Sequence, residues 1–406
     1  MLEWYPEAVS EEALNGLKKY KYSAIDLSPI SRYILQPYWT WAATLFPIWM
    51  APNLITLLGF VFVLFNFFLL LVYTPDLYTP GPSWIYFSFG IGLWLYSTFD
   101  NVDGKQARRT GSSSPLGELF DHGVDALNCT TGALLNAAGL CLGLGDWSLL
   151  SVGIAATAFF FSTWETYYTG TLFLGYINGP TEGLLISISS LFISGIFGPQ
   201  VWTTAVSQVL PFLKPLLGEL SFAHFAVGNM LLLLIFTQIP VSILRVIEVC
   251  GKKNISVTSA LFTTVPYLVM ASSAFFWATA GTHVAPDNTI VFALAWGFAI
   301  GRINALIILN HVTHIEYPSY NFLVVPFAFG AFVARAPQLF GIAPIFNAHT
   351  ESVYIWITFL FITIEYILWA VKVVEQFCDH LNIKCFTIPY KHLLKSASPV
   401  RGRLED

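Results

Sequence analysis

Long apolar runs with few charges are the feature that most constrains this chain of 406 residues. Hydrophobic residues make up 55% of the sequence and charged residues 11%, whereas about 25% charged is typical of soluble domains. An apolar stretch of about 20 residues spans a bilayer as a helix, which satisfies its own backbone hydrogen bonds in lipid. We therefore predict an all-α integral membrane protein with about ten transmembrane helices.

The apolar runs place the spans, of which the fifth is interrupted by glycines and ends at Gly198-Pro199. The predicted ranges are 54–74, 83–100, 122–145, 148–170, 182–205, 223–248, 257–281, 288–311, 319–340 and 352–376. They form one membrane domain, residues 47–377, between an N-terminal segment (1–46) and a C-terminal tail (378–406). Residues 28–46 are rich in Tyr and Trp, which favour the headgroup level, so an N-terminal interfacial helix is expected there; the alternative is a buried helix.

The basic residues predict the orientation. In the ten-span arrangement, one side carries nearly all of them: Lys18, Lys19, Lys21, Arg32, Lys105, Arg108, Arg109, Lys252, Lys253, Lys384, Lys391, Lys395, Arg401 and Arg403. The other side has little beyond Lys214 and Arg335. Because basic loops stay in the cytosol, both termini are expected to be cytosolic.

Other classes are disfavoured by what the sequence lacks. Residues 1–28 are charged and contain no apolar run typical of a signal peptide. The five cysteines show neither metal-binding nor disulfide spacing and are predicted to be free thiols. The basic residues form no dense cluster, which argues against a nucleic-acid partner.

An acidic pattern separates the second and third predicted spans. It reads D-x2-D-G-x2-A-R-x8-G-x3-D-x3-D over residues 100–125, and the first and second pairs of aspartates are three and four residues apart. On helices each pair would share a face. Four converging carboxylates require a cation between them, and an all-oxygen site favours Mg²⁺, Mn²⁺ or Ca²⁺. Gly104 and Gly117 allow a phosphate to approach the backbone, and Arg108 can bind its oxygens.

This pattern matches, at every fixed position, the signature of the CDP-alcohol phosphatidyltransferase family. The surrounding residues, 49–53, 104–110 and 115–122, resemble those of the eukaryotic choline and choline/ethanolamine phosphotransferases. The detailed resemblance covers roughly residues 20–185, and the remainder resembles that subgroup in its hydrophobic layout.

The resemblance implies a reaction. The phospho-alcohol of CDP-choline or CDP-ethanolamine passes to the hydroxyl of diacylglycerol, a membrane lipid, with release of CMP. Two ions of Mg²⁺ (or Mn²⁺) are expected on Asp100, Asp103, Asp121 and Asp125. The expected substrate contacts are Asn53, Gly104, Ala107, Arg108, Gly117 and Glu118. The resemblance also implies a homodimer in the endoplasmic reticulum or Golgi membrane. The positive-inside rule, independently of the motif, predicts that the site faces the cytosol.

A base must take the proton from the acceptor hydroxyl. His122 is the expected base, because an imidazole of ordinary pKa suits this task and a metal-bound carboxylate is a weakened base. Asp125 is the rival, and an orienting role on a metal ligand is the alternative for His122. Asn53 could equally be a helix N-cap, and Glu118 an ordinary glutamate of a first helical turn.

Three other functions compete with this one. The first is another CDP-linked phospholipid synthase, with CDP-diacylglycerol as donor and inositol or glycerol phosphate as acceptor. The second is a secondary transporter, which would place its acidic residues near mid-membrane in repeated halves, whereas here they form one cluster without a second copy. The third is a pseudoenzyme that binds a CDP-alcohol as a sensor. A missing metal ligand would favour this function, but all four aspartates are present.

Overall fold

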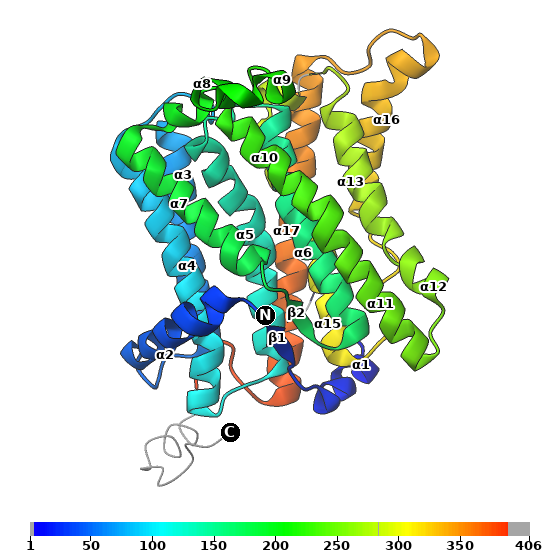
Figure 1. Cartoon of the computed structure of the whole chain (residues 1–406). Helices are drawn as coiled ribbons and strands as arrows, with labels where there is room; N and C mark the ends of the chain where they lie inside the picture. Colours follow the sequence, from blue (N-terminus) through cyan, green and yellow to red (C-terminus); the bar gives the residue numbers. More distant parts are fainter. Residues whose placement is uncertain (1–3, 283, 389–406) are drawn as a thin grey trace.

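The computed structural model describes residues 4–282 and 284–388. The tail from residue 389, which includes the predicted cytosolic residues Lys391, Lys395, Arg401 and Arg403, lies outside the described residues. In the described chain, long helices run side by side (Figure 1). They are α3 (Pro52–Tyr73), α4 (Ser83–Thr110), α5 (Pro115–Gly139), α6 (Asp146–Thr169), α7 (Leu184–Phe197), α10 (Phe222–Leu233), α11 (Ile239–Lys253), α13 (Val265–Ala278), α15 (Thr289–Thr313), α16 (Val324–Phe340) and α17 (Ala348–Leu381).

Shorter elements connect and cap these helices. They are α1 (Glu11–Gly16), β1 (Ala24–Asp26), α2 (Gln36–Leu45), β2 (Leu172–Leu174), α8 (Val206–Val209), α9 (Lys214–Leu217), α12 (Val257–Phe262) and α14 (Val284–Asp287). Figure 1 shows α1, α2, the turn between α4 and α5 and the C-terminal end of α11 at the same end of the molecule. This end therefore carries the predicted cytosolic charges of the described chain.

The all-α membrane class is confirmed. Within the described residues, seven helical stretches are long and apolar enough to cross a membrane. They are residues 52–73, 146–169, 179–197, 222–253, 257–278, 289–313 and 348–381. The remaining three predicted spans also contain helices: α4 and α5 carry the polar motif, and α16 is shorter at 17 residues. The end of the fifth span differs clearly from the prediction, because Gly198 adopts a φ of 82° and ends the helix at Phe197 rather than near residue 205.

The acidic motif forms a helical hairpin rather than a loop. Helix α4 continues past Asp100 to Thr110, where Gly111, with a φ of 64°, ends it. The amide of Ser112 then donates to the carbonyl of Ala107 at 2.9 Å, and Ser114 caps α5. Asp100 lies eleven residues before Gly111 and Asp125 eleven residues after Ser114, so both sit roughly 16 Å from the turn. The spacing of the motif therefore brings carboxylates from two antiparallel helices to one level.

The N-terminal segment packs on the helices. Ala13 and Leu17 are buried against α15 and α17, and a side chain on Gly16 would meet the carbonyl oxygen of Thr313 at 1.8 Å. Strands β1 and β2 then form a parallel pair in which Ala24 lies opposite Leu172. The all-α prediction missed this pair. Helix α2 has one buried and one exposed apolar face, and its interfacial location stays a prediction.

Charged residues inside the helices are paired, as the cost of charge in lipid requires. The Glu165 carboxylate lies 2.6 Å from Nε of Arg245, whose guanidinium stacks 3.5 Å above the Phe173 ring. Arg302 lies 3.5 Å from Glu365. These pairs join α6 to α11 and α15 to α17, and Phe173 connects β2 to the first pair.

Helix α15 approaches α5 so closely that a glycine is needed between them. A Cβ on Gly297 would lie 1.9 Å from Oγ1 and 2.7 Å from Cβ of Thr130, so rotation of that side chain brings no relief. We predict that Gly297→Ala lowers the free energy of unfolding by about 1–3 kcal/mol despite the better helix propensity of Ala. Thermal unfolding of the purified protein measures this. The matched control is Gly228→Ala in α10, where nothing lies within 4 Å and stability should be unchanged or higher; equal melting temperatures for both variants would contradict the packing.

Candidate metal and substrate site

Three aspartates of the motif converge between α4 and α5. One carboxylate oxygen from each of Asp100, Asp121 and Asp125 lies within 4.8 Å of the other two. Both helices pack on α3, and the carboxylates meet beside it. The structure thus brings together three of the four predicted metal ligands.

Hydrogen bonds from neighbouring helices orient the remaining aspartate and one of the three. The Thr56 hydroxyl of α3 donates to Oδ2 of Asp103, which is 7% exposed. The Tyr96 hydroxyl donates to Oδ1 of Asp125. Asp103 lies outside the group of three, so its role as a ligand stays a prediction. Both donors hold a carboxylate in place while leaving its other oxygen available.

The arrangement of these oxygens fits a divalent cation. Oδ1 of Asp100 and Oδ1 of Asp121 are buried and have no hydrogen-bond partner in the described part of the chain. Several carboxylates so close together repel one another at low local dielectric unless a cation lies among them. An all-oxygen donor set is the type that Mg²⁺, Mn²⁺ and Ca²⁺ prefer. The site therefore suits such an ion, and the number of ions stays a prediction.

His122 follows Asp121 on α5, and a backbone contact fixes the orientation of its ring. Its Nδ1 lies 3.1 Å from the backbone carbonyl of Glu118. A carbonyl oxygen only accepts, so Nδ1 is the donor in this contact and Nε2 is not engaged by it. The ring interacts electrostatically with Asp125, three residues further on. A neutral imidazole with a free Nε2 can accept a proton from a bound hydroxyl.

Two helix N-termini meet where a nucleotide phosphate is expected. Asn53 follows Pro52, the first residue of α3, and a Cβ on Gly117 in the first turn of α5 would lie 3.8 Å from Oδ1 of Asn53. Exposed amides and the helix dipole favour anions at such ends. Asn53 also donates to Sγ of Cys385 at 3.5 Å, and the N-cap residue of α3 is Ala51, so Asn53 lies in the first turn rather than at the cap. Two of the predicted substrate contacts are therefore neighbours.

The other predicted contacts line the end of α4 and the start of α5. A Cβ on Gly104 would lie 3.5 Å from a guanidinium nitrogen of Arg108, which is exposed, and Ala107 is partly buried beside them. Oε2 of Glu118 is buried without a hydrogen-bond partner among the described residues. These positions leave Arg108 free to move toward a phosphate.

Two basic residues of the motif region have a different role from phosphate attraction. Nζ of Lys105 donates to Gln36 at 2.8 Å, and Arg109 donates to the carbonyls of Ala43 and Phe46 at 2.9 Å. The second contact neutralises the C-terminal end of α2. Both side chains thus attach α2 to α4.

Tyr22 is a residue near the site that the sequence did not indicate. It is exposed over 57% of its surface, but desolvation of the hydroxyl, and then the charges of Asp121 and Asp100, raise the pKa of Tyr22 to about 12. A hydroxyl that stays protonated can donate a hydrogen bond to an anion. Thr56 and Tyr96 were missed as well. The one available signal was that Tyr96 lies one helical turn before Asp100, on the same face.

Comparison with known proteins places this site in a family. Residues 49–213 match the family model for CDP-alcohol phosphatidyltransferase. Choline/ethanolaminephosphotransferase 1 of Arabidopsis thaliana is 34% identical over 403 residues, which is 94% of this chain and 99% of the relative. The chain belongs to the CDP-alcohol phosphatidyltransferase family.

Two further relatives of this family differ in their named substrates. Ethanolaminephosphotransferase 1 of Homo sapiens is 32% identical over 399 residues, covering 94% of this chain and 95% of the relative. Cholinephosphotransferase 1 of Saccharomyces cerevisiae is 34% identical over 325 residues, covering 77% and 81%. The family match includes the whole acidic motif, Asn53, Thr56 and Tyr96, whereas Tyr22 precedes it.

The aspartate cluster predicts a measurable stabilisation by metal. We expect Mn²⁺ at one hundred times its Kd to raise the free energy of unfolding by about 2.7 kcal/mol, and hence the melting temperature. Asp121→Asn should lose this shift, because it removes one of the converging carboxylates. The control is Asp76→Asn, which changes a carboxylate bonded to Thr79 in the loop after α3 and should respond to Mn²⁺ like the wild type. A normal response in Asp121→Asn would contradict the assignment.

Proposed function

We propose that this protein transfers phosphocholine, phosphoethanolamine or both from the CDP-alcohol to diacylglycerol, forming phosphatidylcholine or phosphatidylethanolamine and CMP. The observation that carries the proposal is the convergence of Asp100, Asp121 and Asp125 on the family motif. The names of the near full-length relatives favour these two alcohols over inositol and glycerol phosphate. Because their named substrates include both, the proposal names both.

In this proposal the carboxylates of Asp100, Asp103, Asp121 and Asp125 hold two ions of Mg²⁺ or Mn²⁺. When bound, such ions neutralise charge on the pyrophosphate and on the departing CMP. The orphaned oxygens of Asp100 and Asp121 support this donor set.

The chain's own residues then position the donor. Asn53, Gly117 and the two helix N-termini bind the nucleotide phosphates, and Gly104 leaves room for the backbone to approach them. Arg108 binds a phosphate oxygen with its guanidinium. Ala107 has a small side chain, which leaves space for the donor beside Arg108. Glu118, with its unpaired oxygen, faces the cationic amine of the donor.

His122 is the proposed general base. Its Nε2 takes the proton from the diacylglycerol hydroxyl as the oxygen attacks the phosphorus, and the bond to CMP breaks. Asp125 is the weaker candidate, since Tyr96 already donates to it and it shares the cluster of carboxylates. The contact between Nδ1 of His122 and the Glu118 carbonyl supports this assignment, because it orients the imidazole ring.

The proposed setting is the endoplasmic reticulum or Golgi membrane, with the site and both termini in the cytosol. The position of Lys105, Arg108, Lys252 and Lys253 at the end of the helices where the motif turns supports this orientation. Cytosolic exposure gives the site access to a soluble nucleotide and to a membrane lipid. The proposed assembly is a homodimer, on family resemblance alone.

The direct test is transfer by the purified protein. With Mg²⁺ or Mn²⁺ and diacylglycerol, CDP-choline or CDP-ethanolamine should yield phospholipid and CMP in equal amounts, and a chelator should abolish both. Failure with both donors, together with turnover of CDP-diacylglycerol and inositol or glycerol phosphate, would replace this proposal with the alternative synthase.

The base assignment predicts a specific defect. His122→Ala should lower kcat by about 10²–10⁴-fold, the usual contribution of a general base, and leave CDP-alcohol binding nearly intact. Steady-state kinetics and a nucleotide binding titration measure the two effects. The matched control is His349→Ala, an exposed histidine at the start of α17 at the opposite end, which should behave as wild type. Near wild-type turnover in His122→Ala would exclude His122 as the base.

A further inference from the structure

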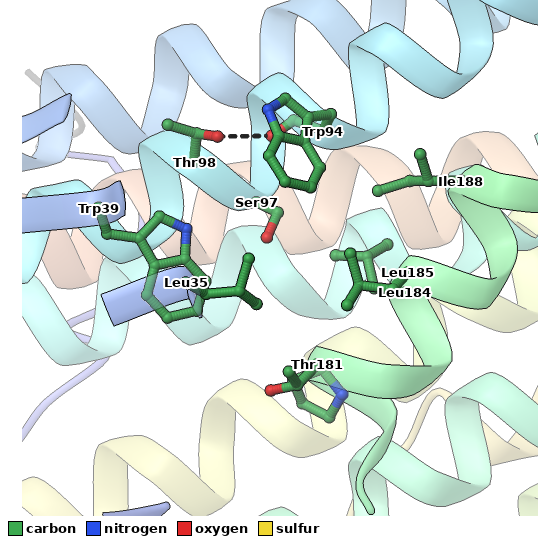
Figure 2. A pocket seen from close by; sticks show the side chains of 10 residues that line it. Leu35, Trp39, Trp94, Ser97, Thr98, Thr181, Leu184, Leu185 and Ile188 are labelled. Carbon is green, nitrogen blue, oxygen red and sulfur yellow. Dashed lines mark hydrogen bonds between the residues drawn. The ribbon is translucent and has the colours of Figure 1, made fainter. Parts of the chain in front are cut away.

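An apolar groove lies between α2, α4 and the N-terminal part of α7 (Figure 2). The empty space between its walls is about 250 Å³ when the open region outside its mouth is counted with it. Its walls include Leu35 and Trp39 from the α2 side, Trp94 and Ser97 from α4, and Leu185 and Ile188 from α7. We call this space the α4–α7 groove.

A polar side chain lines the α4–α7 groove about one helical turn before the first motif aspartate. Figure 2 shows the Ser97 side chain directed into the space between the walls. Ser97 precedes Asp100 by three residues, which is about 4.5 Å along the helix. Among the described residues its hydroxyl has no hydrogen-bond partner, whereas Thr98 and Trp94 are both bonded to the Tyr38 hydroxyl. Ser97 is therefore a free polar group where the groove meets the site.

The surroundings of the groove indicate an occupant that comes from the bilayer. Ile34 on the α2 side and Ile186 on α7 flank it and are 63% and 68% exposed. Exposed apolar side chains on membrane helices face lipid, so the groove opens to hydrocarbon. None of the described residues that line it is charged, which disfavours a lipid with an ionic headgroup. A neutral lipid with hydroxyl and ester groups matches the lining.

We propose that one acyl chain of the diacylglycerol acceptor lies in the α4–α7 groove, with an ester carbonyl accepting a hydrogen bond from Ser97. This places the free glycerol hydroxyl beyond Ser97, toward Asp100 and His122. The inference rests on the proposed function and adds the path by which the acceptor reaches the site. It also gives α2 a role, since α2 forms one wall and is attached to α4 by Lys105 and Arg109.

A second groove of similar size provides a rival location. It encloses about 260 Å³ between α6, α13 and α15, with Pro266, Tyr267 and Tyr317 among its lining residues. Every described residue that lines it is more than four positions in the sequence from each motif aspartate. It therefore has no comparable link to the candidate metal site.

Photolabelling distinguishes the two grooves without relying on a variant. The full chain in lipid nanodiscs is first shown to convert a diacylglycerol that carries a diazirine on one acyl chain. After illumination, labelled peptides should contain residues 94–98 and 184–188, and excess dioleoylglycerol should prevent the labelling. Label centred on residues 266–267 and 317–321, or no competed label, would overturn the inference. Failure of the wild type to convert the analogue and dioleoylglycerol would contradict the proposed function instead.

A pair of adjacent substitutions tests the same groove kinetically. Leu185→Trp should fill the groove and raise the KM for diacylglycerol at least about tenfold, the loss expected when roughly two methylene groups are displaced. The KM for the CDP-alcohol and the melting temperature should stay near wild type. Ile186→Trp is the matched control, because it adds the same side chain to the lipid-facing side. An unchanged KM in Leu185→Trp, or an equal rise in both variants, would overturn the inference.

Discussion

Repulsion among carboxylates is the constraint on which the rest of this structure depends. Asp100, Asp121 and Asp125 bring one oxygen each within 4.8 Å between α4 and α5, where partial burial limits the screening of charge by water. Two of these residues have buried oxygens without hydrogen-bond partners in the described chain. Such an arrangement is stable when a cation lies among the oxygens. A cation bound there would therefore stabilise the α4–α5 hairpin as well as serve the proposed chemistry.

The hairpin explains why the motif has its particular spacing. Equal distances from the turn at residues 111–114 place Asp100 level with Asp125, and the next turn of each helix carries Asp103 and Asp121. The neighbouring helix α3 adds a hydrogen bond that the hairpin alone cannot make, because Thr56 donates to Asp103 and orients its carboxylate. Phosphoryl transfer requires mainly positioning and neutralisation of charge, and the proposed function assigns both to this one structural unit.

Much of this could be predicted from the sequence, because its signals are local. Apolar runs located the helices, fixed spacing located the aspartates and Gly117, and the family resemblance indicated Asn53. The misses come from contacts that no local pattern encodes. Strand β1 pairs with a segment about 150 residues away, and Lys105 bonds Gln36 of α2, which lies 69 residues earlier in the chain. The predicted spans ended at residue 100 and resumed at residue 122, because the polar residues of the motif mask the helical continuation of α4 to Thr110.

The central claim is tested most directly by locating the metal. Crystals of the protein with CDP-choline and Mn²⁺, measured at the manganese absorption edge, would give an anomalous map of the cleft. The account predicts peaks within coordination distance of Asp100, Asp121 and Asp125, with the pyrophosphate oxygens on the same ions. A map in which the nucleotide is bound and these carboxylates carry no peak would contradict it.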